Sequence, residues 1–152
     1  MLDKSMLQGL NILVVEDVDA IRALIVRIVE GLGAANVHQA MGIETALAEL
    51  DTRPFDAVLL DYELDGRDGL VIVNKLRRDD EHFNHDTPII LLTGHSEANI
   101  VKDSLNAGAD DYLVKPVMPE KLGQRILQVI ARRHEEPEVT RPASEVVWGR
   151  RD

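Results

Sequence analysis

Two groups of carboxylates follow short apolar segments of this chain, and their placement suggests a bound cation. Glu16 and Asp17 come directly after Asn11–Val15, and Asp61 comes directly after the run 56–60. Like charges repel in a poorly solvated site, so clustered carboxylates at the ends of buried strands need a positive charge between them. The carboxylates therefore indicate a site that gathers positive charge.

Two later apolar segments also end in polar or charged residues. The run 88–92 leads into Thr93 and Gly94, and the run 110–114 leads into Lys115 and Pro116. In an open parallel sheet the carboxyl ends of the strands meet at one edge, where such folds bind ligands. Four strand ends then bring carboxylates, a hydroxyl and an ammonium group to one place.

Apolar runs alternate with segments of helical period, which predicts five strand–helix units. Such an alternation is typical of a three-layer α/β sandwich with a parallel sheet and right-handed crossovers. The predicted strands are Asn11–Val15, Asn36–Ala40, 56–60, 88–92 and 110–114, and the predicted helices are 18–30, 43–50, Leu70–Arg78, 97–107 and 119–132.

Composition narrows the class of protein. The chain has 152 residues, 45% of them hydrophobic, which suits one domain with a single core. Its net charge of −10 argues against direct contact with nucleic acid or an anionic membrane surface. The absence of cysteine removes disulfides, thiolate metal sites and cysteine nucleophiles. No apolar run approaches the ~20 residues of a membrane span, and no signal pattern is visible, so a cytoplasmic protein is expected.

The end of the chain differs from the rest. After Arg133 the sequence loses its periodicity, so residues 134–152 are predicted to be a flexible tail, with Trp148 as a possible anchor for a partner. The acidic stretch 79–86 is interpreted as a solvated connection rather than a metal loop, because neither cysteine nor regular spacing supports a site. The segment 31–33 follows a helix, so its two glycines indicate a helix end and not a dinucleotide site.

The four strand-end motifs together resemble a known family. The segments 12–17, 59–61, 92–94 and 111–116 are similar, in type and order, to those of the receiver domain of bacterial two-component response regulators. The resemblance covers residues 9–133 and implies a flavodoxin-like, chemotaxis-regulator-like fold with strand order 2-1-3-4-5 and five helices. Because the tail is too short for an output domain, a stand-alone receiver is expected.

The resemblance implies a role for each strand-end residue. Asp61 would accept a phosphoryl group from a phosphohistidine, with Mg²⁺ or Mn²⁺ held by Glu16, Asp17, Asp61 and the backbone carbonyl of Glu63. Lys115 would pair with a phosphoryl oxygen, and its bond to Pro116 would be cis. Thr93 would donate its hydroxyl to the phosphoryl group, and Tyr112 would move with it as a switch. On this interpretation the protein is a phosphoacceptor and not an enzyme that turns over an external substrate.

The loop after Asp61 departs from the family pattern. The proline that is common there is absent, and Asp65 stands in that region. Glu63 and His95 each lie two residues after a motif residue, beside the expected path of a hydrolytic water. These two side chains are therefore predicted to set the lifetime of the phosphoaspartate.

The first predicted helix carries an apolar stripe wider than burial alone requires. Its core face is expected to hold Ile21, Leu24, Ile25, Ile28 and Leu32, while Val18, Arg22 and Val26 form a surface for docking. The resemblance implies a sensor histidine kinase or a histidine phosphotransferase as the partner, and a downstream protein as the target.

Two other interpretations stay open. The second interpretation, after a stand-alone receiver, is the receiver fragment of a larger transcription factor or hybrid kinase. Asp17-Val18-Asp19 also imitates the paired aspartates of haloacid-dehalogenase-like aspartyl phosphatases, although no cap domain is present. Each motif residue alone has an ordinary explanation, such as a helix cap, a turn or a surface charge, and only their conjunction favours the receiver.

Overall fold

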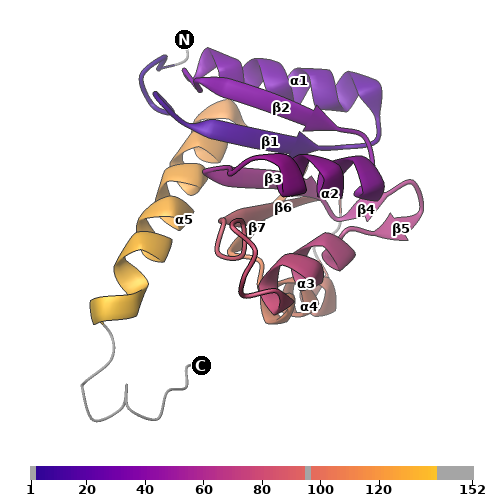
Figure 1. Cartoon of the computed structure of the whole chain (residues 1–152). Coiled ribbons are helices and arrows are strands. Elements are labelled where there is room, and N and C mark those ends of the chain that lie inside the picture. The colour runs from indigo at the N-terminus through magenta and orange to yellow at the C-terminus, as the bar shows by residue number, and fades with distance from the viewer. Residues whose placement is uncertain (1–2, 95–96, 140–152) are drawn as a thin grey trace.

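A parallel sheet of five strands forms the centre of the molecule in the computed structural model, which describes residues 3–94 and 97–139 (Figure 1). The strands of the sheet lie in the order β2-β1-β3-β6-β7, which is the predicted order 2-1-3-4-5 of the five main strands. Their bounds are β1 Asn11–Val15, β2 Asn36–Ala40, β3 Ala57–Asp61, β6 Ile89–Thr93 and β7 Asp111–Val114.

Five helices cover the two faces of this sheet (Figure 1). Each lies between or after strands in the predicted alternation, which confirms the flavodoxin-like three-layer class. Their bounds are α1 Asp19–Gly31, α2 Ile43–Thr52, α3 Leu70–Arg78, α4 Ala98–Ala107 and α5 Pro119–Val139. No helix among the described residues is both long and apolar enough to cross a membrane.

The alternating side chains of the strands supply two separate cores. Ile12, Val14, Leu59 and Ile90 face α1 and α5, where Val29 and other apolar residues of those helices pack against them. Leu13, Val58, Leu60 and Leu91 point to the opposite face and pack against α2 and α3. Strands buried on both faces read as continuous apolar runs, which is why the sequence shows them so clearly.

Several boundaries differ from the prediction. Leu7, two residues before the predicted start of the domain, is fully buried and its N–H donates to the carbonyl of Leu32. At the other end α5 continues to Val139, so residues 134–139 extend the last helix instead of beginning the predicted tail. The rest of that tail, with Trp148, lies outside the described residues.

A short antiparallel hairpin follows β3 and was not predicted. It pairs β4 Glu63–Leu64 with β5 Arg67–Asp68 through a turn at Asp65 and Gly66. Both turn residues have positive φ, 53° and 77°. This backbone matches the two-residue hairpin turn for which Asp-Gly is a favoured sequence.

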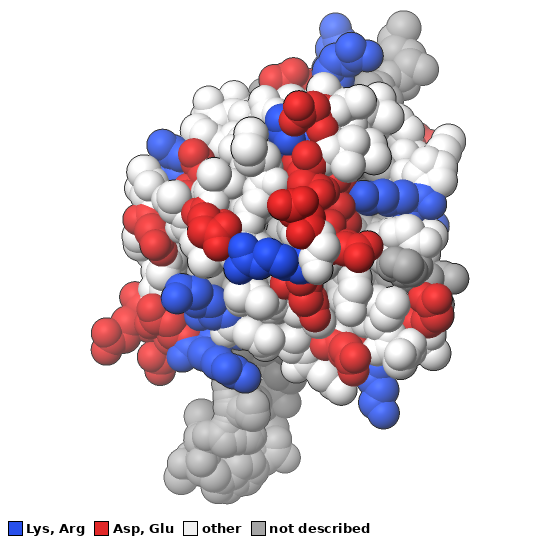
Figure 2. Space-filling view, turned by 90° about the vertical axis from the view of Figure 1, so that its right-hand side faces the viewer, with Lys and Arg blue, Asp and Glu red and all other residues white. Residues whose placement is uncertain are grey.

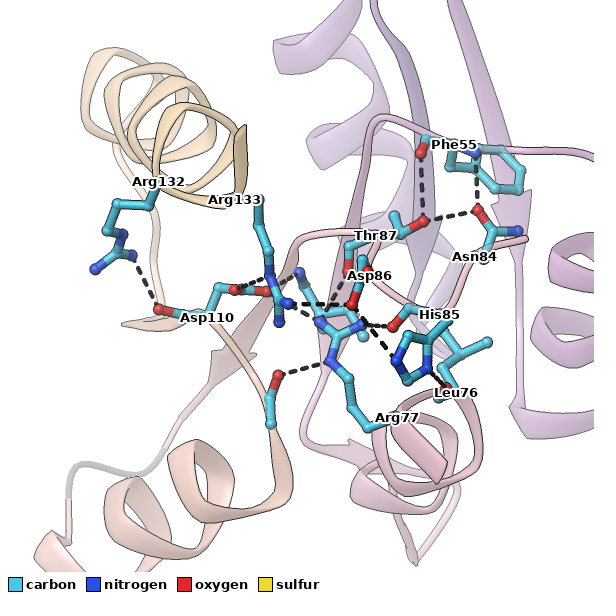
Figure 3. Close-up of polar contacts among 12 residues, drawn as sticks. Phe55, Leu76, Arg77, Asn84, His85, Asp86, Thr87, Asp110, Arg132 and Arg133 are labelled. Carbon is cyan, nitrogen blue, oxygen red and sulfur yellow. Dashed lines mark hydrogen bonds and ion pairs between the residues drawn. The ribbon is translucent and has the colours of Figure 1, made fainter. Parts of the chain in front are cut away.

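The connection between α3 and β6 was predicted to be a solvated loop. In the structure a buried side chain, that of Asn84, holds it in place. The Nδ2 group of this fully buried residue donates to the carbonyls of Leu50 and Arg53. Its Oδ1 accepts hydrogen bonds from the N–H of Phe55 and from Oγ1 of Thr87 (Figure 3). A buried amide with all these partners is a structural element and no metal ligand.

Next to this loop, Arg77 forms the centre of a network at the amino edge of the sheet (Figure 3). Its guanidinium donates to the carbonyls of His85, Thr87 and Gly108 and, over 3.0 Å, to Asp110 Oδ2. Asp110 also accepts from Arg133 Nε at 2.7 Å. Burial and the nearby charge of Arg133 lower the pKa of Arg77 to about 10, so it stays charged at neutral pH.

Candidate functional site

The four strand-end motifs meet in one pocket at the carboxyl edge of the sheet. The pocket has a volume of about 450 Å³ and is open to solvent on one side. Figure 2 shows this edge, toward which β1 and β3 point in Figure 1, with acidic side chains gathered near its centre. Its lining residues are Glu16, Asp17, Val18, Asp61, Glu63, Asp65, Gly66, Thr93, Gly94 and Lys115.

Three carboxylates stand close together in this pocket. One oxygen from each of Glu16, Asp17 and Asp61 lies within 4.8 Å of the others. Glu16 is 1% exposed and Asp61 7% exposed, so two of the three are buried. Carboxylate oxygens at this spacing are a donor set that suits a hard divalent cation such as Mg²⁺. Among the described residues this is the group of acids that could hold such an ion.

Lys115 supplies positive charge to the same group. Its Nζ lies 2.8 Å from Glu16 Oε1 and 3.2 Å from Asp61 Oδ2. Burial raises the pKa of Glu16, and the hydrogen bond from Lys115 offsets only part of that rise. Burial alone would lower the pKa of Lys115, but the hydrogen bond to Glu16 and the charge of Asp61 raise it overall. Lys115 is therefore charged, and it faces more negative charge than it can neutralise.

Asp61 is fixed by the backbone around it. Its Oδ1 accepts the N–H of Glu63 over 3.2 Å, and its strand pairs on both sides with β1 and β6. Gly69 lies against the same backbone, since a Cβ at this position would collide with the carbonyl of Asp61. The glycine that ends the β3–α3 loop therefore allows that loop to pack against the backbone of Asp61.

Thr93 and Tyr112 lie on neighbouring strands. Thr93 is buried and lines the pocket, while Tyr112 is half-buried and pairs with Leu91 two residues earlier on β6. Side chains two residues apart on a strand share a face, so Tyr112 lies on the same side of the sheet as Thr93. Tyr112 also lines a second hollow of about 510 Å³ against Val101 and Leu105 of α4. The bond between Lys115 and Pro116 is cis, as predicted.

Several contacts at the site were not predicted from the sequence. The N–H of Asp65 donates to Asp17 Oδ2 over 2.8 Å, and Arg22 Nη1 donates to the carbonyl of Glu16 over 2.9 Å. Arg67 also pairs with Glu44 at 2.8 Å, which ties the hairpin to α2. The Asp-Gly pair at 65–66 was the signal that could have indicated this hairpin.

Some predicted site residues do not belong to the pocket. Val26 is 7% exposed and packs in the core, so it does not form a docking surface, whereas Leu24, predicted to be in the core, is 53% exposed. Arg22 is mostly buried by its contacts with Glu16, Asp19 and Gln39. It is therefore mainly a structural residue and not a docking residue. Val18 is exposed, as a docking residue must be. His95 lies outside the described residues.

The paired aspartates of the phosphatase interpretation are separated. Asp17 lines the pocket, but the side chain of Asp19 is 85% exposed and bonds to Arg22 at the start of α1. Helix α1 therefore carries the second aspartate away from the first. The geometry gives no support to an Asp-x-Asp phosphatase site.

Comparison with known protein families gives a single clear match. Residues 12–127 match the response regulator receiver domain. The chain is 36% identical over 122 residues to the phosphate regulon transcriptional regulatory protein PhoB of Escherichia coli, covering 80% of this chain and 52% of PhoB. It is 35% identical over 131 residues to the sensor histidine kinase GacS of Pseudomonas protegens, covering 84% of this chain and 14% of GacS. The chain thus spans about half, or less, of the length of these relatives.

Solved structures show the same fold. A CheY-like receiver domain from Methanospirillum hungatei superposes with a TM-score of 0.75 at 29% identity, covering 85% of this chain and 99% of that one. The receiver domain of the sensor histidine kinase PA1611 from Pseudomonas aeruginosa superposes with a TM-score of 0.72 at 28% identity, covering 81% of this chain and 98% of that one. In the PA1611 structure a magnesium ion is coordinated in the active site cleft.

Proposed function

This chain belongs to the response regulator receiver domain family, and from that premise we propose that Asp61 is the residue that takes up the phosphoryl group. The observation that carries the proposal is the placement of the Asp61 carboxylate beside Lys115 and the two acids that follow β1. Outside this cluster of three acids, no carboxylate among the described residues combines burial at a strand end with a neighbouring lysine and two further acids.

The chemistry follows from the residues around Asp61. A carboxylate oxygen of Asp61 attacks the phosphorus of a donor phosphohistidine, a new O–P bond forms, and the P–N bond breaks with its electron pair going to the imidazole, which then takes a proton. Lys115 Nζ, 3.2 Å from Asp61 Oδ2, is placed to pair with a phosphoryl oxygen that arrives there. Thr93 lines the same pocket and is placed to donate its hydroxyl.

We further propose that Glu16, Asp17, Asp61 and the backbone carbonyl of Glu63 hold Mg²⁺ or Mn²⁺. The three carboxylates fit such an ion, because they gather hard oxygen donors that one lysine does not neutralise. When bound, the ion would supply the positive charge that lets an anionic carboxylate meet an anionic phosphoryl group.

The signal would leave the pocket through Thr93 and Tyr112. If Thr93 moves toward a phosphoryl group, it vacates space on the face of the sheet where Tyr112 lies. Tyr112 borders the exposed surface of α4. Among the described residues of this helix, Ser104 is the one that is buried. A loosely packed helix next to a switch residue suits a two-state change that a downstream protein reads.

We propose that the phosphodonor docks on a surface that includes Val18 and Leu24 in place of the buried Val26. Val18 and Leu24 of the α1 region are exposed and apolar, and they lie on the helix that begins at the pocket. A sensor histidine kinase or histidine phosphotransferase would bind there. We expect Leu24→Asp to slow phosphotransfer from a kinase severalfold without slowing phosphorylation by acetyl phosphate, and equal loss of both reactions would contradict this docking surface.

We also propose that Glu63 and His95 set the lifetime of the phosphoaspartate. Glu63 is exposed at the rim of the pocket, where its side chain would influence a hydrolytic water; its predicted partner in this role, His95, is not among the described residues. We propose likewise that the protein accepts a phosphoryl group without turning over an external substrate, lies in the cytoplasm and acts through contact with other proteins.

The direct test is to phosphorylate the protein and find the modified residue. With acetyl phosphate and Mg²⁺, we expect a single labelled peptide that contains Asp61, and no label on Asp61→Asn. Asp19→Asn is the matched control, since Asp19 lies outside the pocket, and it should be labelled like the parent. Label on another residue, or label that persists in Asp61→Asn, would contradict the proposal.

A further inference from the structure

The turn of the β4–β5 hairpin holds one of the pocket's carboxylates. The backbone N–H of Asp65 donates to Asp17 Oδ2 over 2.8 Å, although the two residues lie 48 positions apart in the chain. Two residues earlier in the same hairpin, the N–H of Glu63 donates to Asp61 Oδ1 over 3.2 Å. Alternate amides of one short segment therefore bind two of the three acids that gather at the site.

We propose that this hairpin is a positioning element of the cation site and that the Asp65 amide holds Asp17 in place before a cation binds. This inference rests on the proposed function, because it assigns a role around the same three acids. Without such a bond, Asp17 would be free to rotate away from Glu16 and Asp61, whose charges repel it. A hydrogen bond to an ionised carboxylate is strong enough to oppose that rotation.

The residue at the turn makes this contact possible. A proline at this position would have no N–H to donate to Asp17. Asp65 also adopts φ of 53°, a conformation that proline's ring forbids but that aspartate, asparagine and glycine tolerate. The departure from the family pattern that the sequence shows at Asp65 thus provides a donor that a proline would remove.

The hairpin is anchored through its second strand, β5. Arg67 pairs with Glu44 at the start of α2, and Asp68 Oδ1 accepts the N–H of Leu70 at the start of α3. The ion pair is exposed and contributes little by itself. Together with the buried Leu64, however, these contacts fix the turn over the pocket. A fixed donor orients its acceptor better than a mobile one.

The test compares two substitutions of the same residue by their affinity for Mg²⁺, measured by calorimetry on unphosphorylated protein. Asp65→Pro removes the amide donor, and Asp65→Asn keeps the amide and the turn while removing the carboxylate. We expect Asp65→Pro to bind Mg²⁺ about tenfold more weakly than the parent, and Asp65→Asn to stay within about twofold. Equal affinities for Asp65→Pro and the parent, or equal losses in both variants, would overturn the proposal.

A second measurement does not depend on how Asp65→Pro folds. In the metal-free protein, the Asp65 amide proton should resonate downfield and exchange slowly, and Asp17→Ala should shift it upfield and speed its exchange. An unchanged amide in Asp17→Ala would overturn the inference. Phosphorylation of Asp61 at saturating Mg²⁺ separates the two claims, because the inference can fail while Asp61 is still labelled in the parent.

Discussion

Two clusters of buried charge lie at opposite edges of the same sheet, and they are built in opposite ways. At the amino edge, Arg77 makes four hydrogen bonds to fixed acceptors, and Asp110 lies between Arg77 and Arg133 (Figure 3). At the carboxyl edge, three carboxylates lie together, and the one ammonium group of Lys115 pairs with two of them, Glu16 and Asp61. The first cluster is neutralised by the chain itself, and the second is left with excess negative charge.

This difference separates charge that serves stability from charge that serves function. Arg77, with all its partners present, holds α3, the loop before β6 and α5 together. Removing one partner leaves the remaining buried charges and carbonyls unpaired. A buried cluster that lacks positive charge raises the free energy of the folded state, and a cation or a phosphoryl group changes that balance. The second arrangement is the one expected at a site that binds and reacts.

The largest expected effect tests the amino edge. Arg77→Ala leaves Asp110 without its buried partner and three carbonyls without their donor, so we expect the free energy of unfolding to fall by about 3–5 kcal/mol in urea denaturation. Arg78→Ala changes the neighbouring residue of the same helix end, which is exposed, and should cost less than about 0.5 kcal/mol. Similar losses in the two variants would remove the contrast on which the comparison depends.

A smaller effect tests how the carboxyl edge is packed. Gly69→Ala places a Cβ against the carbonyl of Asp61, so the β3–α3 loop must shift. We expect a loss of about 1–3 kcal/mol in stability, as for other overpacked sites, and slower phosphorylation of Asp61. Gly94→Ala is the control for stability, since its Cβ meets no atom within 4 Å. Equal stability of Gly69→Ala and the parent would show that the loop does not need this close approach.

The response to a cation tests the claim of missing positive charge. Mg²⁺ at about 100 times its dissociation constant should stabilise the protein by about 2.7 kcal/mol, a rise of several degrees in melting temperature. Asp17→Asn should lose most of this rise, whereas Arg78→Ala should keep it. If Mg²⁺ does not change the melting temperature of the parent protein, the proposed cation site is contradicted.

Much of the fold could be predicted because the central strands β1, β3 and β6 are buried on both faces, and because the edge strands β2 and β7 continue the alternation of strands and helices. Their apolar runs ended within one residue of the observed strands, and the residues that follow them identified Asp61, Asp17, Glu16 and Lys115. The sequence order of those motifs carried the prediction, since a parallel sheet brings the carboxyl ends of its strands to one edge.

What the sequence missed depends on contacts between distant segments. The β4–β5 hairpin has strands of two residues, too short to show a period, and its hold on Asp17 exists only after folding. The docking surface was misplaced at Val26 because helical spacing defines a stripe but not which of its borders the sheet and α5 cover. The partners of Arg77 come from two connections of the chain, α3–β6 and α4–β7, and the second lies 31 to 33 residues away in sequence, so no local pattern indicates them.

One substitution made at both edges tests the central claim most directly. Asp61→Asn and Asp110→Asn each replace a buried carboxylate by an amide of the same shape, and their free energies of unfolding can be compared without metal. We predict that Asp61→Asn gains about 1 kcal/mol, because repulsion with Glu16 and Asp17 falls. We predict that Asp110→Asn loses about 2–4 kcal/mol, because Arg77 and Arg133 lose the carboxylate that they share. A loss in both variants would mean that the carboxyl edge is neutralised as fully as the amino edge, and would contradict the account.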